Sequence, residues 1–496
     1  MISAVAAGIL PGPQWAQPVG WHHRLIIAAI HPDDAVAMWH ARAWLGGHDI
    51  DVVTFREHRL LAAIIVRFGR RLADLDSYPR LVGLQRMLWT RTMMSLREAA
   101  PALSAMVAAG VPVMVIKGAA RMADGGDSAR GRVAHDIDIV VRPSHMAGAF
   151  AILVEGGWTP ASGASVLSLA AGIGQVRGMN LFRGSFGDID LHSLAFHPVH
   201  GSAIDDDGLW SRAQKRVLSG VDVLVPSAED RLAISVGHGG LDAHAHADWL
   251  VDMAVTLTSM PVDYGVLAGL IERRRLSCPA LVAFDYLKSN GDFGIADGFL
   301  DQLRTWSLSR PFRSLGELLE ARPRDRSGPV LHGLRWLAKQ MRKARGGPST
   351  TEKAPQPRLA VHRSHRTAAA SAADAAQRLN WDIEIPPDLS GAAWLRIRLQ
   401  VRLATPAVRR RIEFEVNTPT AHLARGRFRN LWRFEKLDLR ISADFGIQPG
   451  TEKLILSSRP GRHLRPCAGS DDVAAYGALP FTLISAAVTA VQPGRE

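Results

Sequence analysis

Two short stretches of the sequence carry residues whose types and spacing suit metal and phosphate chemistry. Asp136 and Asp138 are separated by one residue within the largely apolar run His135–Val140. Side chains at positions i and i+2 of a strand point to the same face, so we expect the two carboxylates to project together. Lys117 and Gly118 end the preceding apolar run. The pattern predicts a site for a divalent cation and a polyphosphate.

A phosphoryl-transfer site of this kind needs oxygen ligands for Mg2+ or Mn2+ and usually uses more than one carboxylate. We therefore expect a third carboxylate from an adjacent strand. The run Asp188-Ile-Asp190-Leu-His192 offers two candidates. Spacing does not choose between Asp188 and Asp190, because both face the same side of that strand.

The Lys117-Gly118 pair lies where a strand is expected to meet a helix. Glycine lets the backbone approach a phosphate, and a helix N-terminus favours its negative charge. Lys117 would add a point charge. Arg132 precedes Asp136 by four residues, and we expect it to contact either the triphosphate or the domain's own acidic edge.

Strands and helices alternate around these motifs, which is typical of an α/β arrangement. The predicted strands cover residues 113–116, 137–141 and 186–191, and a predicted helix covers Met146–Glu155. Before them, Ala100-Pro101 predicts a break in a helical region. After them, Ser227 is expected to cap the next helix.

The periodicity changes to two near the end of the chain. Leu395, Ile397 and Leu399 alternate with polar residues, and runs near Phe414 and Leu437 behave alike, which predicts an all-β sandwich-like domain. The expected organisation is a helical lead-in over 1–110, an α/β (α+β) core over 111–225, a helical appendage over 226–340, a basic flexible linker over 341–378, and the β domain over 379–496.

Composition restricts the class of protein. An apolar share of 47% with 21% charged residues excludes a wholly disordered chain. Cys278 and Cys467 are far apart, which excludes a disulfide framework and favours a reducing cytoplasm. No run approaches the about 20 apolar residues of a membrane span. The net charge of +12 leaves a nucleic-acid partner open without favouring it.

Histidines cluster further along the chain and raise a second metal hypothesis. His238, His244 and His246 are close in sequence, and Asp242 and Asp248 lie among them. His244 and Asp248 have the i, i+4 spacing that zinc sites use on helices. The favoured interpretation is nevertheless a polar loop and a packed histidine, because no HExxH pattern or cysteine partner accompanies them.

The stretches Ala109–Ala120 and Arg132–Val141 resemble the uncharacterised nucleotidyltransferase family of bacteria. That family shows an LKG-like element, an R-x-x-x-DIDLLV-like element and an I-E-L-H element. The last is here Ile189-Asp-Leu-His192, and the likeness selects Asp190 over Asp188 as the third carboxylate. The resemblance covers about residues 54–260 and leaves the β domain unexplained.

The resemblance implies a polymerase β-like nucleotidyltransferase fold and metal-dependent transfer of a nucleoside monophosphate from an NTP to an unidentified acceptor. It implies that Asp136, Asp138 and Asp190 are catalytic and hold Mg2+ or Mn2+. It also implies that nucleotide binding, of ATP or another NTP, falls to Lys117, Gly118 and Arg132. Lys117-Gly118 departs from the Gly-Ser of the wider superfamily. The rival hypotheses are a degenerate nucleotide-binding or scaffold protein and a protein of glycan or peptide biosynthesis.

Overall fold

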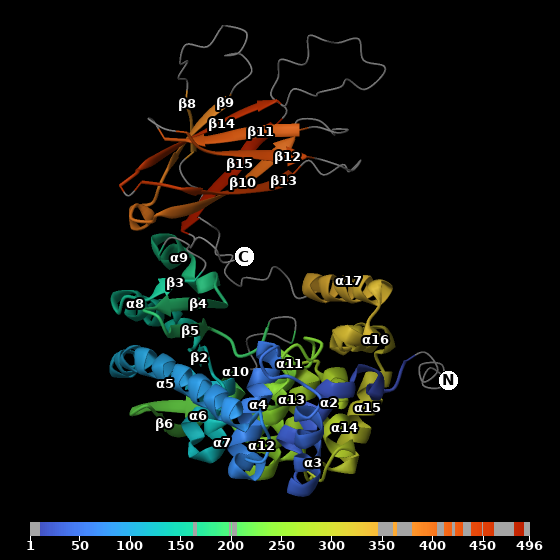
Figure 1. Cartoon of the computed structure of the whole chain (residues 1–496). Helices are drawn as coiled ribbons and strands as arrows, with labels where there is room; N and C mark the ends of the chain where they lie inside the picture. The colour runs from blue at the N-terminus through green and yellow to red at the C-terminus, as the bar shows by residue number, and fades with distance from the viewer. Residues whose placement is uncertain are drawn as a thin grey trace, which may run out of the picture. The chain divides into compact units, whose positions relative to one another are not determined.

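A computed structural model of the chain describes residues 10–161, 166–197, 200, 206–345, 361–364, 379–403, 411–418, 422–429, 438–448, 450–460 and 481–490 (Figure 1). By its internal contacts the chain divides into two compact units. The first unit comprises residues 1–158 and 177–351, and the second comprises residues 159–176 and 352–496. Among the described residues, no helix is long and apolar enough to cross a bilayer.

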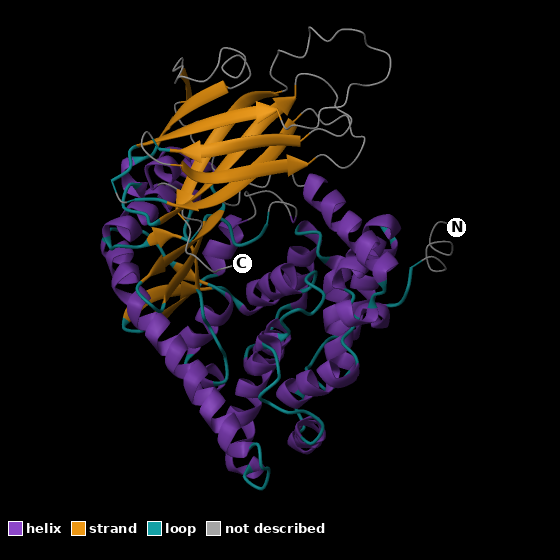
Figure 2. Ribbon diagram, turned by 45° about the horizontal axis from the view of Figure 1, so that its top comes forward, coloured by secondary structure: helices purple, strands orange, loops and turns teal. Residues whose placement is uncertain are grey.

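The first unit is mainly helical, as the purple ribbons of Figure 2 show. Its helices before residue 137 are η1 (Pro13–Ala16), α2 (Gly20–Ile30), α3 (Asp34–Leu45), α4 (Phe55–Phe68), η2 (Gly69–Leu72), α5 (Tyr78–Ala108), α6 (Lys117–Asp124) and α7 (Gly126–Arg130). The later ones are η3 (Pro143–His145), α8 (Met146–Glu155), α10 (Asp206–Arg212), α11 (Ala228–Gly239), α12 (Asp248–Ser259), α13 (Tyr264–Arg273), α14 (Ser277–Ser289), α15 (Asp297–Leu308), α16 (Pro311–Ala321), η7 (Arg324–Arg326) and α17 (Pro329–Arg345).

Six strands of the first unit lie in one mixed sheet, in the order β4-β5-β2-β1-β7-β6. They are β1 (Met114–Val115), β2 (Ile137–Val140), β4 (Gly178–Arg183), β5 (Gly187–His192), β6 (Gln214–Leu218) and β7 (Val221–Val225). Strand β2 runs antiparallel to β1 and parallel to β5. Every residue of β2 is buried, which explains its almost continuous apolar sequence. The α/β character predicted for this segment is confirmed.

Two local predictions in the first unit are confirmed. The helix predicted over Met146–Glu155 is α8, with those bounds. The hydroxyl of Ser227 accepts a hydrogen bond from the amide of Asp230 (3.3 Å) and thereby caps α11. Each follows from local chemistry, because a glycine ends α8 and a hydroxyl satisfies an amide at the start of α11.

The break predicted at Pro101 is wrong, because α5 continues through it from Tyr78 to Ala108. A proline removes one backbone hydrogen bond and clashes with the preceding turn. The opposing contribution is burial, since Ala99, Leu103 and Met106 lie on one side of this helix and are almost fully buried. Tertiary packing therefore outweighs the local cost.

The second unit is mainly β structure. Its elements are β3 (Thr159–Pro160), α9 (Val166–Gly172), η4 (Ile173–Gln175), β8 (Val361–Ser364), β9 (Leu379–Glu384), η8 (Pro387–Leu389), β10 (Trp394–Leu403), β11 (Arg411–Asn417), β12 (His422–Arg429), β13 (Asp438–Gly446), β14 (Lys453–Pro460) and β15 (Phe481–Ala490). Strands β8 to β15 form two antiparallel sheets, in the orders β13-β10-β15 and β12-β11-β14-β9-β8.

The period-two pattern of the β segment is confirmed in β10. Leu395, Ile397 and Leu399 are buried there, and they pack in one cluster with side chains of the other sheet, such as Trp381 and Leu456. Leu437 and Cys467 lie outside the described residues. The predicted linker over 341–378 includes the end of α17 and strand β8, and residues 346–360 and 365–378 lie outside the described residues.

Candidate metal and nucleotide site

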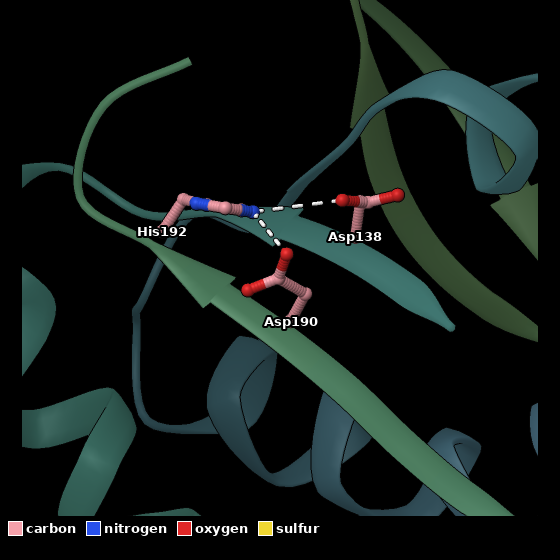
Figure 3. A group of neighbouring side chains, drawn as sticks. All are labelled: Asp138, Asp190 and His192. Atoms are coloured by element: carbon pink, nitrogen blue, oxygen red, sulfur yellow. Dashed lines mark ion pairs between the residues drawn. The ribbon is translucent and has the colours of Figure 1, made fainter. Parts of the chain in front are cut away.

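The parallel pairing of β2 and β5 brings two of the predicted carboxylates together. Asp138 on β2 is the register partner of Asp190 on β5. His192 lies two residues further along β5, so its side chain shares the face of Asp190. One ligand atom from each of these three residues lies within 4.8 Å of the others. Figure 3 shows the imidazole pointing at both carboxylates.

Asp138 and His192 are the most deeply buried residues of this cluster. His192 is only 4% exposed. Its Nε2 lies 2.9 Å from Asp190 Oδ2 and 3.5 Å from Asp138 Oδ1 (Figure 3). These are ion-pair distances, but among the described residues neither ring nitrogen has a hydrogen bond of acceptable geometry. The donor set is two carboxylates and one imidazole, which fits a divalent cation.

A glycine makes room for this ring. Gly178 on β4 is the register partner of His192. A Cβ at position 178 would lie 2.5 Å from Nδ1 of His192 and 3.2 Å from the carbonyl oxygen of Leu191. Any side chain there would have to displace the imidazole, so the ring position depends on the glycine.

Lys117 lies against the same cluster. The backbone amide of Ile116 donates to the carbonyl of Asp138 (3.1 Å), which fixes the end of β1 beside β2. Lys117 then begins α6 with a φ of 53°, a left-handed conformation that is uncommon for a lysine. Its Nζ lies 2.6 Å from Asp138 Oδ1. Gly118 follows, and a Cβ there would lie 3.2 Å from that of Ala134.

The charges of this core depend on one another. Burial disfavours the charged form of Asp138, but Lys117 and His192 outweigh it and hold the pKa of Asp138 well below its usual range. Burial likewise disfavours the charge of Lys117, and Asp138 outweighs it and raises the pKa of the lysine. Burial lowers the pKa of His192, but contact with Asp138 and Asp190 outweighs this effect and raises the pKa above its usual value. The Lys117 ammonium thus offsets the buried charge of Asp138, and the His192 ring lies against the same carboxylate.

Two further carboxylates surround this core. Asp136 is half-buried, and burial together with the nearby Asp138 raises its pKa. Asp188 lies on the same face of β5, and burial together with Asp136 raises its pKa to about 6. Several acidic groups therefore share one face of the sheet, where each makes the ionisation of the next more costly.

Arg132 contacts two aspartates that lie outside the predicted core of residues 111–225. Its guanidinium lies 2.6 Å from Asp248 and 2.9 Å from Asp252, both on α12. Arg59 also pairs with Asp248 (2.7 Å), and Arg121 pairs with Asp252 (3.0 Å). All five side chains are largely buried. The network joins α4 and α6 to the acidic face of α12, and a nucleotide contact for Arg132 stays a prediction.

A small pocket lies beside Lys117. Helices α6, α11 and α12 supply most of its lining. Two arginines contribute charge to it, Arg121 and Arg231, and Ser235 and Thr256 contribute hydroxyl groups. Because Lys117 contacts both this pocket and Asp138, the lysine connects the pocket to the carboxylate cluster.

The later histidines make backbone contacts. His238 Nε2 lies 2.8 Å from the carbonyl of Ala195, and His244 Nε2 lies 3.0 Å from that of Ala16. Asp248 is held by arginines. The interpretation that disfavoured a zinc site here agrees with these contacts.

Sequence reasoning did not assign His192 to the ligand cluster. The missed signal was the spacing itself, because Asp190 and His192 stand at i and i+2 of one strand and must share a face. Asp136 was expected in the cluster but is absent from the group of ligand atoms found among the described residues.

Comparison with known proteins adds one family and one structure. The model of an uncharacterised nucleotidyltransferase family matches residues 56–290. No curated protein matches the chain. A family GH115 4-O-methyl-α-glucuronidase with specificity for decorated arabinogalactans matches at 8% identity, over 53% of this chain and 38% of that chain, with a TM-score of 0.16. That TM-score is too low to carry an argument. The carboxylate cluster and Lys117 lie inside the matched segment, and the family whose model matches it is one of nucleotidyltransferases, a class of transferases.

Proposed function

We propose that the chain is a metal-dependent nucleotidyltransferase that moves a nucleoside monophosphate from an NTP to an acceptor hydroxyl or similar group. The observation that carries the proposal is the pairing of Asp138 with Asp190 on parallel strands, with the Lys117 ammonium 2.6 Å from Asp138. Buried carboxylates with an adjacent cation suit the handling of a metal-bound polyphosphate.

The metal would be held by Asp136, Asp138 and Asp190, with Mg2+ or Mn2+ as the ion. Asp138 and Asp190 are register partners, and Asp136 precedes Asp138 by two residues on the same face. When bound, such an ion polarises the phosphate and neutralises the charge that develops in phosphoryl transfer.

The residues of the chain have separate tasks in the reaction. The acceptor oxygen attacks the α-phosphorus as the bond to the β-phosphate oxygen breaks, and pyrophosphate leaves. Asp190 accepts the acceptor's proton, since its side chain is 18% exposed and is the more accessible of the paired carboxylates. Lys117 leaves Asp138 to contact the triphosphate, and the Gly118 amide at the start of α6 donates to it.

We propose that the phosphate groups of the nucleotide reach Lys117 from the side of the small pocket beside it. Arg121 and Arg231 would offset part of the negative charge of the phosphates, although each already pairs with an aspartate. A nucleotide must therefore compete with Asp252 and Asp124 for these guanidinium groups.

We also propose the finer organisation that the sequence predicts. The two sheets of β8 to β15 form a sandwich-like module, and their shared buried cluster supports this. The five segments with boundaries at 110, 225, 340 and 378 remain the proposed functional division. The acceptor is the open chemical question, and a glycan or peptide precursor is among its candidates.

A screen of the four NTPs with Mg2+ or Mn2+, read as pyrophosphate release, tests the proposal. Asp138→Asn and Asp190→Asn are expected to abolish release. Asp222→Asn is the matched control, because Asp222 is exposed on β7. Nucleotide binding without pyrophosphate release across a panel of acceptors would instead indicate a degenerate nucleotide-binding protein.

A further inference from the structure

His192 offers a nitrogen donor to the proposed metal site. This inference concerns the same site and rests on the proposed function for its biological meaning. Its basis is geometric, because the imidazole is 4% exposed and its Nε2 points between Asp138 and Asp190 (Figure 3).

Two of the three distances between the donors match those around a bound cation. Two neighbouring ligands of an ion with bonds of about 2.1 Å lie about 3.0 Å apart in an octahedron and about 3.4 Å apart in a tetrahedron. The Nε2 atom lies 2.9 Å from one carboxylate oxygen and 3.5 Å from the other. These two distances allow one ion to contact Nε2 and both carboxylates, in competition with Lys117 for Oδ1 of Asp138.

The strand beside β5 leaves room for the ring in this orientation. The strand opposite carries Gly178, and a Cβ there would lie 2.5 Å from Nδ1. The fold thus keeps free the space that this imidazole needs in order to face the carboxylates.

We propose that His192 Nε2 is a direct ligand of the metal, together with Asp138 and Asp190, and that the site prefers Mn2+ to Mg2+. The preference follows from the donor, because Mg2+ favours oxygen ligands and imidazole binds transition-metal ions more readily.

Binding of Mn2+ alone, measured by electron paramagnetic resonance, tests the proposal. The wild-type spectrum, recorded with pulsed methods, is expected to show coupling to a histidine nitrogen. His192→Ala should lose the coupling and bind Mn2+ at least about tenfold more weakly. His332→Ala is the control, because His332 is exposed on α17, and it should change neither quantity.

A second variant keeps the test valid if His192→Ala does not fold. His192→Asp supplies a third carboxylate, and we expect it to keep Mg2+ affinity while the ratio of the Mg2+ and Mn2+ dissociation constants falls towards one. Bound Mn2+ without nitrogen coupling in the wild type would overturn the proposal, and so would failure to bind Mn2+. Nitrogen coupling in a protein that releases no pyrophosphate would sustain this inference and defeat the proposed function alone.

Discussion

Lys117 Nζ lies 2.6 Å from Oδ1 of Asp138, the same oxygen that lies 3.5 Å from His192 Nε2. A single carboxylate oxygen thus faces the Lys117 ammonium and the His192 ring. Without a metal the ammonium offsets the buried charge of Asp138, and a metal has to compete with it for that oxygen. The ion pair connects the residue after the first strand of the sheet to the carboxylate cluster on the second.

Removing the Lys117 ammonium is expected to raise the affinity for metal and to lower the catalytic efficiency with the NTP. In Lys117→Met the affinity for Mn2+ alone should rise, because Asp138 loses a competing cation. The value of kcat/KM for the NTP should fall by about 100-fold, as for the loss of one charge-stabilising donor. Metal titration and steady-state kinetics measure the two effects. Lys215→Met, at an exposed position of β6, is the control, and an unchanged Mn2+ affinity in Lys117→Met would contradict the competition.

Gly178→Ala is expected to damage the site through the position of His192. The added Cβ would lie 2.5 Å from Nδ1, so the ring or the strand must move. We expect the free energy of unfolding to fall by about 1–3 kcal/mol and Mn2+ binding to weaken. Urea unfolding and Mn2+ titration measure these changes. Gly148→Ala is the matched control, because nothing lies within 4 Å of its Cβ position on α8. Equal stabilities of the two variants would refute the steric argument.

The ion-pair network around Arg132 is expected to contribute mainly to the free energy of unfolding. Arg132→Met leaves Asp248 and Asp252 with fewer partners in a buried place. Breaking a buried ion pair from one side costs about 3–5 kcal/mol, and urea unfolding measures it. The exposed Arg130, changed to Met, is the control. If the variant keeps wild-type stability but its KM for the NTP rises, then Arg132 contacts the nucleotide and the structural role assigned here is wrong.

Asp242 is expected to make stability depend on pH. Burial raises the pKa of Asp242 to about 7, whereas the unfolded carboxyl titrates near about 3.9. The folded protein therefore keeps a proton that the unfolded chain loses, so the free energy of unfolding falls as pH rises between these values and is constant above them. The contribution is at most about 4 kcal/mol. Asp242→Asn should flatten this part of the profile, and Asp222→Asn should not.

Local sequence patterns predicted the parts of the site that depend on neighbours in the chain. The two-residue spacing of Asp136 and Asp138, the strand end at Lys117 and the cap at Ser227 all follow from such patterns. The parallel pairing of Asp138 with Asp190 joins residues 52 positions apart, and no local pattern specifies that register. The resemblance to a family chose Asp190, and the structure placed it beside Asp138.

Other features required the tertiary structure. The contacts of Arg132 with α12 depend on how two distant segments pack, so its alternatives could not be resolved from sequence. Pro101 shows the reverse case, because a reliable local signal for a break was overridden by burial of the surrounding helix. His192 was predictable in principle from its spacing to Asp190, but its orientation towards Asp138 depends on the room left by Gly178.

The central claim is transfer of a nucleoside monophosphate at the Asp138–Asp190 pair. The most direct measurement follows the label from an NTP carrying 32P at either the α or the γ position, with Mn2+ and a panel of acceptors. The account predicts that the α label is transferred to an acceptor, that the γ label leaves as pyrophosphate, and that Asp190→Asn abolishes transfer. Transfer of the γ label, or α-label transfer that survives Asp190→Asn at the wild-type rate, would contradict it.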